Sequence, residues 1–244
     1  MNELKHGADF RSVLADFKLS DSAKKTLAQT KLVLLVGPSS SGRNTAINKL
    51  VEMGGYHYII SDTTREKRMK DGEPIEQDGR EYWFRTEEEI LDDLQHGEFL
   101  EAAIIHDQQV SGISIRELDK ANQAGLTAIT DIEPQGAEWI HGLKPDSIIM
   151  FVVPPNFDDW IGRLKRRSEM PDDELRRRLH TACNEIKAAL ERDYFQFVVN
   201  DELDNTVKDI DAVAKNGKQN EEKQAQGRQV AEQLFEAAQS YLGD

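Results

Sequence analysis

The stretch that decides the fold is Leu32-Val-Leu-Leu-Val-Gly-Pro-Ser-Ser-Ser-Gly-Arg-Asn-Thr45, in which three structural signals follow one another. The apolar residues at its start predict a buried strand, and a turn rich in serine and glycine comes directly after them. Beyond the turn, Ile47, Leu50 and Val51 share one helical face, and Gly54 ends the helical pattern. The order of strand, turn and helix is typical of the first unit of an α/β fold.

The turn is similar to a phosphate-binding loop of the pattern G-x-x-x-x-G-K-[ST]. Glycines at its two ends let backbone N–H groups fold around phosphate oxygens, and the following helix directs its positive N-terminal end at the same anion. The alternative is a turn between strand and helix that binds no ligand. The residues predicted to bind phosphates are Gly37, Pro38, Ser39, Ser40, Ser41, Gly42, Arg43, Asn44 and Thr45.

Two residues of this loop depart from the pattern. Arg43 replaces the usual lysine and keeps its positive charge on a larger planar group, so the charge is placed differently. Asn44 replaces the hydroxyl residue that usually binds Mg²⁺, although its amide oxygen can also coordinate a hard cation. Thr45 and Ser41 are alternative ligands. Both departures favour slower catalysis and a weaker metal site.

The rest of the sequence alternates short apolar runs with helical patterns, which predicts a mainly parallel sheet flanked by helices. Residues 1–30 carry apolar positions at helical spacing and predict a docked helical extension. Residues 207–228 are too polar to bury, so we expect a mobile loop there, followed by a C-terminal helix. The predicted strands lie at residues 57–60, 99–105, 126–132, 147–153 and 196–199.

The net charge of −14 over 244 residues opposes general binding to nucleic acid or to acidic membranes, because most of the surface would repel a polyanion. No apolar run reaches the roughly 18 residues of a membrane span and the first residues lack a signal-peptide pattern, so a cytoplasmic location is expected. Two basic stretches suit a small polyanion such as a nucleotide, with solvated helix faces as the alternative. They comprise Arg65, Lys67, Arg68 and Lys70, then Arg163, Lys165, Arg166, Arg167, Arg176, Arg177 and Arg178.

An ordered series of motifs resembles the guanylate kinase family from about residue 31 to 206. Ser61-Asp-Thr-Thr-Arg65-Glu-Lys-Arg68 and Asp78-Gly-Arg-Glu-Tyr82-Trp-Phe84 are spaced like its S-x-T-T-R-x-x-R and G-x-x-Y-x-F segments. The resemblance implies an α/β fold with a P-loop NTPase-type parallel sheet core flanked by helices. It also implies a small acceptor-binding α+β insert at about 62–115 and a helical lid at about 157–180. Residues 1–30 and 207–244 flank this domain. Further matches are Glu98-Phe-Leu-Glu101, Asp131-Ile-Glu-Pro-Gln-Gly136, Val153-Pro-Pro155, Arg163-Leu164, Arg178-Leu179 and Val199-Asn-Asp-Glu-Leu-Asp204.

The resemblance implies that the chain binds ATP and GMP and transfers a phosphoryl group between them with Mg²⁺. Arginine, serine and tyrosine side chains can bind a monoester phosphate through charge-assisted hydrogen bonds, and a buried carboxylate can select the adjacent N–H donors of guanine. The family's second tyrosine is absent near residue 111, so two serines are its candidate replacements. The predicted GMP site comprises Ser61, Arg65, Arg68, Tyr82, Glu101, Asp131, Ser111 and Ser114.

The resemblance also implies roles in the donor half of the reaction. Phosphoryl transfer requires positioning and neutralisation of charge, which arginines of a closing lid provide. Asn200 matches the position near the donor adenine, with a turn-forming residue as the alternative. Asn44, Thr45 and Glu133 are the predicted metal ligands. The predicted catalytic residues are Arg43, Arg163, Arg167 and Arg178.

Three functions remain open on the sequence. A guanylate kinase is favoured by the lid arginines, because a module without catalysis has no use for them. A nucleotide- or protein-binding module of the same shape, with weak or absent catalysis, is favoured by Arg43 and Asn44. A kinase for another small phosphate acceptor is favoured if the region from Ser111 to Ser114 cannot receive guanine. Either a monomer or a homodimer is compatible with the sequence.

Overall fold

A computed structural model describes residues 3–167 and 170–243 of the chain. These residues form two compact units. The first unit comprises residues 3–31 and 57–128, and the second comprises residues 32–56, 129–167 and 170–243. The chain passes from one unit to the other between Lys31 and Leu32, and again within the strands β2 (Tyr56–Tyr58) and β9 (Thr127–Asp131).

The main sheet has five strands in the order β11-β10-β1-β9-β2. Its central strands are parallel: β1 pairs with β10, with Val33 opposite Ile148, and β10 pairs with β11. All residues of β1 are buried, as expected of a strand covered on both faces. The parallel α/β core predicted from the sequence is confirmed. The other three strands of this sheet are β1 (Leu32–Val36), β10 (Ile148–Val153) and β11 (Phe195–Val199).

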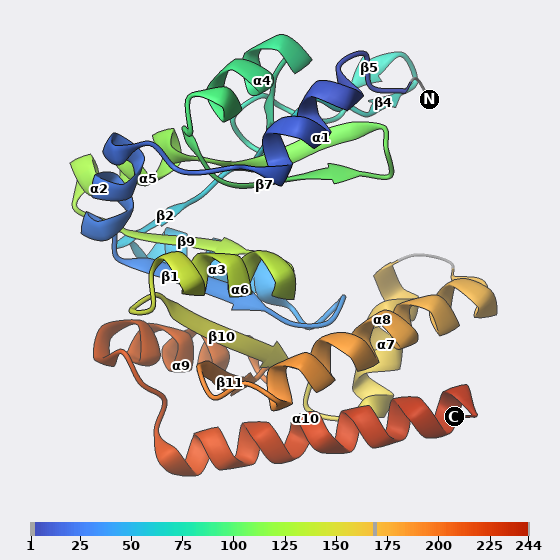
Figure 1. Ribbon diagram of the computed structural model, residues 1–244. Helices are drawn as coiled ribbons and strands as arrows, with labels where there is room; N and C mark the ends of the chain where they lie inside the picture. The colour runs from blue at the N-terminus through green and yellow to red at the C-terminus, as the bar shows by residue number, and fades with distance from the viewer. Residues whose placement is uncertain (1–2, 168–169, 244) are drawn as a thin grey trace. The chain divides into compact units, whose positions relative to one another are not determined.

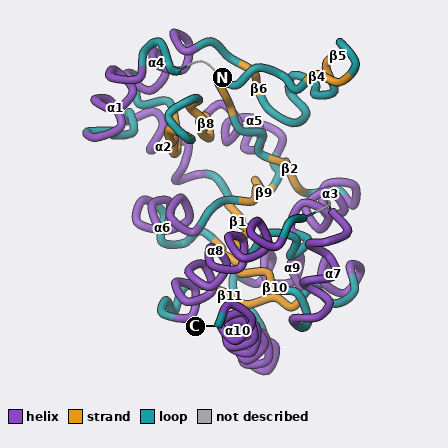
Figure 2. Tube along the Cα trace, turned by 90° about the vertical axis from the view of Figure 1, so that its right-hand side faces the viewer, coloured by secondary structure: helices purple, strands orange, loops and turns teal. Residues whose placement is uncertain are grey.

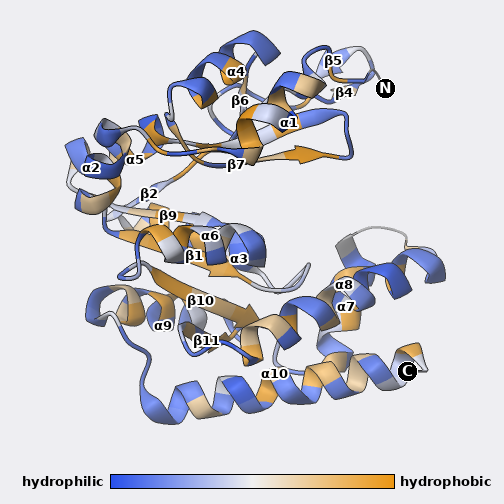
Figure 3. Ribbon diagram, in the orientation of Figure 1, coloured by the Kyte–Doolittle hydropathy of each residue, from blue (hydrophilic) through white to orange (hydrophobic). Residues whose placement is uncertain are grey.

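Helices cover both faces of this sheet in the second unit. In Figure 2, α6 and α8 lie on one side of β1, β10 and β11, and α3 and α9 lie on the other. Figure 3 shows the reason for this arrangement, because β1 and β10 are hydrophobic along their length while the helices are hydrophobic on one side only. The helices of the second unit up to residue 216 are α3 (Arg43–Met53), α6 (Pro134–Leu143), α7 (Phe157–Arg167), α8 (Asp172–Leu190) and α9 (Leu203–Asn216).

The mobile loop expected at residues 207–228 is wrong at both ends, because α9 continues to Asn216 and the C-terminal helix begins at Glu221. Val207, Ile210 and Val213 recur at helical spacing and are buried, so the polar residues between them occupy the outer face of a helix. The connection to the C-terminal helix α10 (Glu221–Leu242) is limited to residues 217–220.

Helix α10 covers the edge of the main sheet at β11, and runs alongside it in Figure 1. Edge strands expose backbone groups that lack partners, and here glutamine side chains supply them. Gln224 accepts a hydrogen bond from the Phe197 N–H at 2.7 Å and donates one to the Phe195 carbonyl at 2.9 Å. Gln219 donates to the Phe197 carbonyl at 3.2 Å. Gly227 permits the close approach, because a Cβ there would lie 2.7 Å from the Phe197 Cβ.

The first unit is built on a second, four-stranded sheet in the order β6-β3-β8-β7. The strand predicted at residues 99–105 is correct in its bounds, but it pairs antiparallel with β8 in this sheet. A two-stranded hairpin of β4 and β5 also belongs to this unit. The strands are β3 (Asp62–Thr63), β4 (Met69–Lys70), β5 (Glu73–Pro74), β6 (Trp83–Phe84), β7 (Phe99–Ile105) and β8 (Gln109–Ser114).

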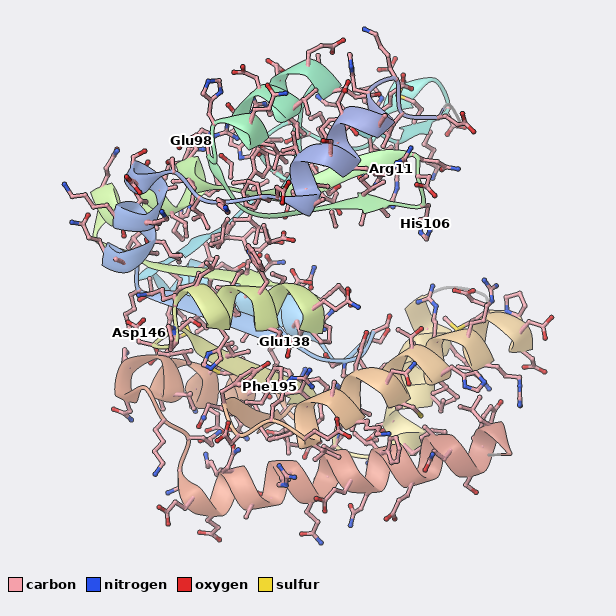
Figure 4. All side chains as sticks on the ribbon, viewed as in Figure 1. Arg11, Glu98, His106, Glu138, Asp146 and Phe195 are labelled. Carbon is pink, nitrogen blue, oxygen red and sulfur yellow. The ribbon has the colours of Figure 1, made fainter. Side chains whose placement is uncertain are left out.

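The N-terminal helices pack on this sheet and on its helices. Phe10 of α1 (Gly7–Ala15) is fully buried in a cluster with Ile90, Phe99 and Val110. Arg11 of the same helix reaches the β7–β8 turn, where its Nη1 lies 3.2 Å from an Asp107 carboxylate oxygen; Figure 4 labels Arg11 and the adjacent turn residue His106. The other helices of the unit are α2 (Asp21–Gln29), α4 (Glu87–Gln95) and α5 (Ile115–Ala124).

Across residues 3–167 and 170–243, none of the helices combines the length and the apolar character that crossing a bilayer requires.

Candidate functional site

A cavity of about 1100 Å³ opens in the second unit around the loop between β1 and α3. The residues lining it come from that loop, from the ends of β9 and β11, and from α7 and α8. Three side-chain oxygens of lining residues are buried without a hydrogen-bond partner: Ser40 Oγ, Ser41 Oγ and Glu185 Oε2. Because buried polar atoms in native proteins nearly always have partners, unsatisfied oxygens gathered in one cavity point to a ligand or ordered water there.

The loop itself has the backbone of an anion cradle. Gly42 has φ +96° and Ser40 has φ +64°, values that turn the chain sharply ahead of α3. Trp160 of α7 donates its indole N–H to the Ser39 carbonyl at 2.9 Å, and Asn200 donates its side-chain amide to the Ser41 carbonyl at 2.6 Å. These bonds fix the carbonyls of Ser39 and Ser41 to α7 and to the end of β11 and so hold the path of the loop.

Asn200 is buried and both of its polar side-chain atoms are occupied. Its amide nitrogen binds Ser41, and its oxygen accepts a hydrogen bond from Thr206 Oγ1 at 3.0 Å. The same nitrogen would lie 2.0 Å from a Cβ at Gly42. The structure therefore makes Asn200 a support of the phosphate loop, and its predicted contact with adenine stays a prediction.

Arg43 lies among acidic residues at the start of α3. Its Nη2 lies 3.9 Å from an Asp131 oxygen, and Glu133 and Glu185 line the same cavity. Burial raises the pKa of the Glu185 carboxyl, the neighbouring Glu133 raises it further, and Arg43 acts in the opposite direction. Asp131 was predicted as a contact for GMP; the structure places it in this cavity of the second unit.

Two arginines of the predicted lid reach the loop and its supports. Arg178 donates from Nη1 to Ser39 Oγ at 3.3 Å and from Nε to Glu174 at 2.8 Å. Arg163 donates to the Asn200 carbonyl at 2.9 Å. Arg167 ends α7, and its side chain lies outside the described residues.

Several residues of the cavity were missed by sequence reasoning. Glu174, Thr181 and Glu185 line it together with Arg178, and the spacing of these four positions places them on one face of α8. That spacing was a readable signal. Arg166 and Arg177 are solvent-exposed and also line the cavity.

The predicted phosphate grip, the set of residues that would bind the acceptor phosphate, lies in the first unit. It comprises Ser61, Arg65, Arg68 and Tyr82. Arg65 forms a bidentate ion pair with Glu76, with N–O distances of 2.9 Å and 2.8 Å, and the Arg68 backbone N–H binds the same carboxylate at 2.7 Å. The guanidinium of Arg65 also lies over the Tyr82 ring, 5.3 Å from its centroid. Hydrogen bonds from Arg65 hold the pKa of Glu76 down at about 2. Glu76 was not predicted, and it holds both arginine segments together.

Glu101 and the two predicted serines lie on the β7–β8 pair. A β-bulge between Phe99 and Glu101 redirects β7 at this point, and burial raises the pKa of the Glu101 carboxyl to about 7. Ser111 donates its hydroxyl to Thr63 Oγ1 at 2.8 Å. Ser114 is buried, and its hydroxyl caps α5 by accepting from the Arg116 N–H. The structure therefore explains Ser114 as a helix cap and leaves Ser111 as the serine with a predicted role toward guanine.

Comparison with known proteins identifies the family of this chain. The family profile described as Guanylate kinase matches residues 29–217. The chain belongs to the guanylate kinase family. A guanylate kinase of Corynebacterium diphtheriae is 35% identical over 182 residues, which cover 74% of this chain and 92% of that protein. A guanylate kinase of Legionella pneumophila is 31% identical over 195 residues, which cover 80% of this chain and 90% of that protein.

A solved guanylate kinase structure agrees with this family assignment. The crystal structure of guanylate kinase from Anaplasma phagocytophilum matches with a TM-score of 0.55 and 25% identity, covering 84% of this chain and 94% of that one. Arg43 and Asn44, which depart from the phosphate-loop pattern, therefore stand in a chain whose fold is similar to that of a guanylate kinase. Helices α1 and α10 lie outside the range that the family profile matches.

Proposed function

We propose that this chain transfers the γ-phosphoryl group of ATP to GMP, giving ADP and GDP. The observation that carries the proposal is the cavity of the second unit, in which a glycine-flanked loop at a helix N-terminus meets Arg178 and unsatisfied buried oxygens. A phosphate chain bound there would receive backbone N–H groups, the positive end of α3 and cationic side chains together. The relatives that match over most of their length carry the name guanylate kinase.

On the donor side, Gly37 to Thr45 would bind the ATP phosphates, and the arginines would neutralise the transferring group. Phosphoryl transfer asks the protein for alignment and charge neutralisation, which suits Arg43, Arg163 and Arg178 at this cavity. The acceptor GMP phosphate is already an anion at neutral pH, so no general base is needed. We assign the lid to residues of about 157–180, with Arg167 included as a prediction.

On the acceptor side, the GMP phosphate would be bound by Arg65, Arg68, Ser61 and Tyr82. The guanine base would be bound by Glu101. The ion pair with Glu76 keeps the Arg65 guanidinium fixed, so little side-chain freedom is lost when a phosphate arrives. We assign the acceptor-binding insert to residues of about 62–115. Ser111 and Asp131 remain proposed contacts of the same nucleotide.

A magnesium ion fits the donors at the phosphate loop. Among the described residues, no cluster of three or more carboxylate, imidazole or thiol side chains could hold a metal alone. Magnesium in kinases needs only one or two protein oxygens beside waters and phosphates, and each of the candidates Asn44, Thr45 and Glu133 has a side-chain oxygen to offer. When bound, the ion would supply positive charge to the phosphate oxygens.

We place this reaction in purine nucleotide metabolism in the cytoplasm.

The test of this function is ADP formation in a coupled assay with ATP, Mg²⁺ and each nucleoside monophosphate in turn. GMP is expected to be the best acceptor, because a carboxylate accepts both N1–H and N2–H of guanine but meets an acceptor atom on adenine. If ADP forms only with another nucleoside monophosphate, that compound is the acceptor and the assignment of GMP is wrong.

A binding module without catalysis is the second candidate, and Arg43 and Asn44 are the observation that favours it. Folded protein that binds ATP and GMP but forms no ADP with any acceptor would establish the module. The variant Arg43→Lys sharpens the comparison, since a kinase limited by the placement of the loop cation should be faster with lysine, whereas a module should stay inactive.

The raised pKa of Glu101 predicts a pH-dependent affinity for the guanine base. The ionised carboxylate is the form that accepts guanine N–H donors, and with a pKa of about 7 this form is lost as the pH falls below neutrality. Binding of guanosine should therefore weaken about tenfold between pH 8 and pH 6. The measurement is the dissociation constant of guanosine by calorimetry across this range.

Guanosine is chosen because the GMP phosphate itself titrates near pH 6 and would add its own dependence, by analogy with phosphoserine. Glu101→Gln is the control, and it should bind guanosine weakly at every pH while ATP affinity stays unchanged. An equally steep pH dependence in this variant, or equal losses for ATP and guanosine, would remove Glu101 from the base site.

A further inference from the structure

The first turn of α5 contains two charged residues that the proposed reaction does not use. Arg116 and Glu117 follow the Ser114 cap, and Glu117 is 1% exposed. A carboxylate taken out of water is costly unless several donors compensate it, so the partners of Glu117 say what its burial achieves.

Glu117 joins two segments that are distant in sequence. Its Oε2 accepts the Ile60 backbone N–H at 3.1 Å, between β2 and β3, and lies 3.2 Å from Nε2 of His57 in β2. Its Oε1 accepts the Trp83 indole N–H at 3.1 Å and the Lys120 ammonium at 2.6 Å. Burial alone would raise the pKa of Glu117, but the hydrogen bonds from His57, Lys120 and Ile60 outweigh it and lower the pKa to about 2. The group is therefore a permanent anion near neutral pH.

Arg116 binds the other side of the same segment. Its Nη2 donates to an Asp62 carboxylate oxygen at 2.8 Å, and Asp62 is fully buried. The other Asp62 oxygen accepts from Arg85 at 3.1 Å. Ser61 thus stands between Ile60, bound to Glu117, and Asp62, bound to Arg116.

Tyr82 is held by the same cluster through its neighbour. Trp83 donates its indole N–H to Glu117 and its backbone N–H to the Ser61 carbonyl at 2.9 Å. The Lys120 ammonium lies over the Trp83 ring, 4.3 Å from its centroid. Ser61 and Tyr82, two residues of the proposed phosphate grip, are therefore adjacent to residues bound by one carboxylate.

We propose that Arg116 and Glu117 form a clamp that positions Ser61 and Tyr82 for the phosphate of the acceptor nucleotide. The clamp is a set of positioning residues, because neither side chain needs to touch the nucleotide. It acts by fixing the backbone on both sides of Ser61 and the indole beside Tyr82, so the two hydroxyl groups are held in place before the phosphate arrives. This inference rests on the proposed function, since it concerns the acceptor phosphate.

The experiment compares Glu117→Gln with the wild-type chain in its binding of GMP, guanosine and ATP. Glutamine has the shape of glutamate but lacks the charge, and its NH₂ group cannot accept the hydrogen bonds of one carboxylate oxygen. The dissociation constant of GMP should rise at least about tenfold, because loss of the clamp misplaces phosphate ligands. Guanosine, which lacks the phosphate, and ATP should each change less than about twofold. In turnover, KM for GMP should rise while KM for ATP stays constant.

The matched control is Glu88→Gln, which removes a carboxylate from the surface of the same unit, where Glu88 pairs with Lys5. It should leave all three affinities unchanged. If Glu117→Gln does not fold, Trp83→Phe replaces it, since this variant keeps an aromatic ring and removes only the indole donor; it should weaken GMP and spare guanosine.

The outcomes separate the clamp from the proposed function. If the wild-type chain does not bind GMP, both are overturned. If wild type binds GMP and Glu117→Gln binds it equally well, only the clamp is overturned. Equal losses for GMP and guanosine also overturn it, because they indicate general damage to the unit instead of a misplaced phosphate grip.

Discussion

Arg178→Ala is expected to lower kcat about 10²- to 10³-fold while the affinity for ATP changes less than about threefold. Arg178 is held between Glu174 and Ser39 Oγ at the rim of the phosphate loop, so its guanidinium is oriented before the nucleotide binds. Charge on the transferring phosphoryl group changes most in the transition state, and a pre-oriented cation stabilises that state more than bound ATP. The measurement is kcat and KM for both nucleotides.

Arg192→Ala is the matched control for this variant. Arg192 pairs with Glu138 at 2.9 Å and does not line the cavity, so its removal should leave kcat within about twofold of wild type. A fall in ATP affinity as large as the fall in kcat would mean that Arg178 binds the ground state, and the proposed transition-state role would be wrong.

Gly42→Ala is expected to weaken ATP binding about a hundredfold and to destabilise the fold by about 2–4 kcal/mol. Gly42 has φ +96°, a conformation that costs an L-residue energy, and the added Cβ would lie 2.0 Å from Asn200 Nδ2. Asn200 would have to release the Ser41 carbonyl, and the loop would lose one of the bonds that hold its path. Calorimetric titration with ATP and thermal unfolding measure the two effects.

Gly142→Ala is the control for backbone effects in general. Gly142 lies in α6, and a Cβ there would meet nothing within 4 Å, so alanine should be neutral or stabilise the helix by about 0.5–1 kcal/mol. ATP affinity of Gly42→Ala close to that of wild type would show that the loop tolerates a different path, and the cradle described above would not be the phosphate site.

Local patterns in the sequence were sufficient for much of the fold. A capping box at Thr86 begins α4 and Pro171 directly precedes α8, and both are signals that can be read from the local sequence. The C-terminal region was misjudged, because polar composition was given more weight than the helical spacing of Val207, Ile210 and Val213. β8 was not predicted as a strand either, since its irregular residues become a strand only by pairing with β7.

The residues of the candidate site also divide into those that local motifs reveal and those that only the folded chain reveals. The phosphate loop, the arginines and Glu101 were visible as motifs, because their residue types and spacing along the chain carry the signal. Glu76, Glu117 and Trp160 were not visible, because each acts on a partner that only the folded chain brings near. Their roles in the acceptor and donor sites remain proposals that the variants above test.

The sequence by itself determined the parallel α/β core, the strand–loop–helix unit from Leu32 onward and the family, because apolar periodicity and backbone preferences are local properties of the chain. Only the tertiary structure decided which polar groups support the loop and the acceptor segment. Asn200 meets Ser41 across 159 positions and Trp83 meets Glu117 across 34. Such pairs are fixed by packing of whole elements and by the need to satisfy buried polar atoms, and neither constraint is written in the order of neighbouring residues.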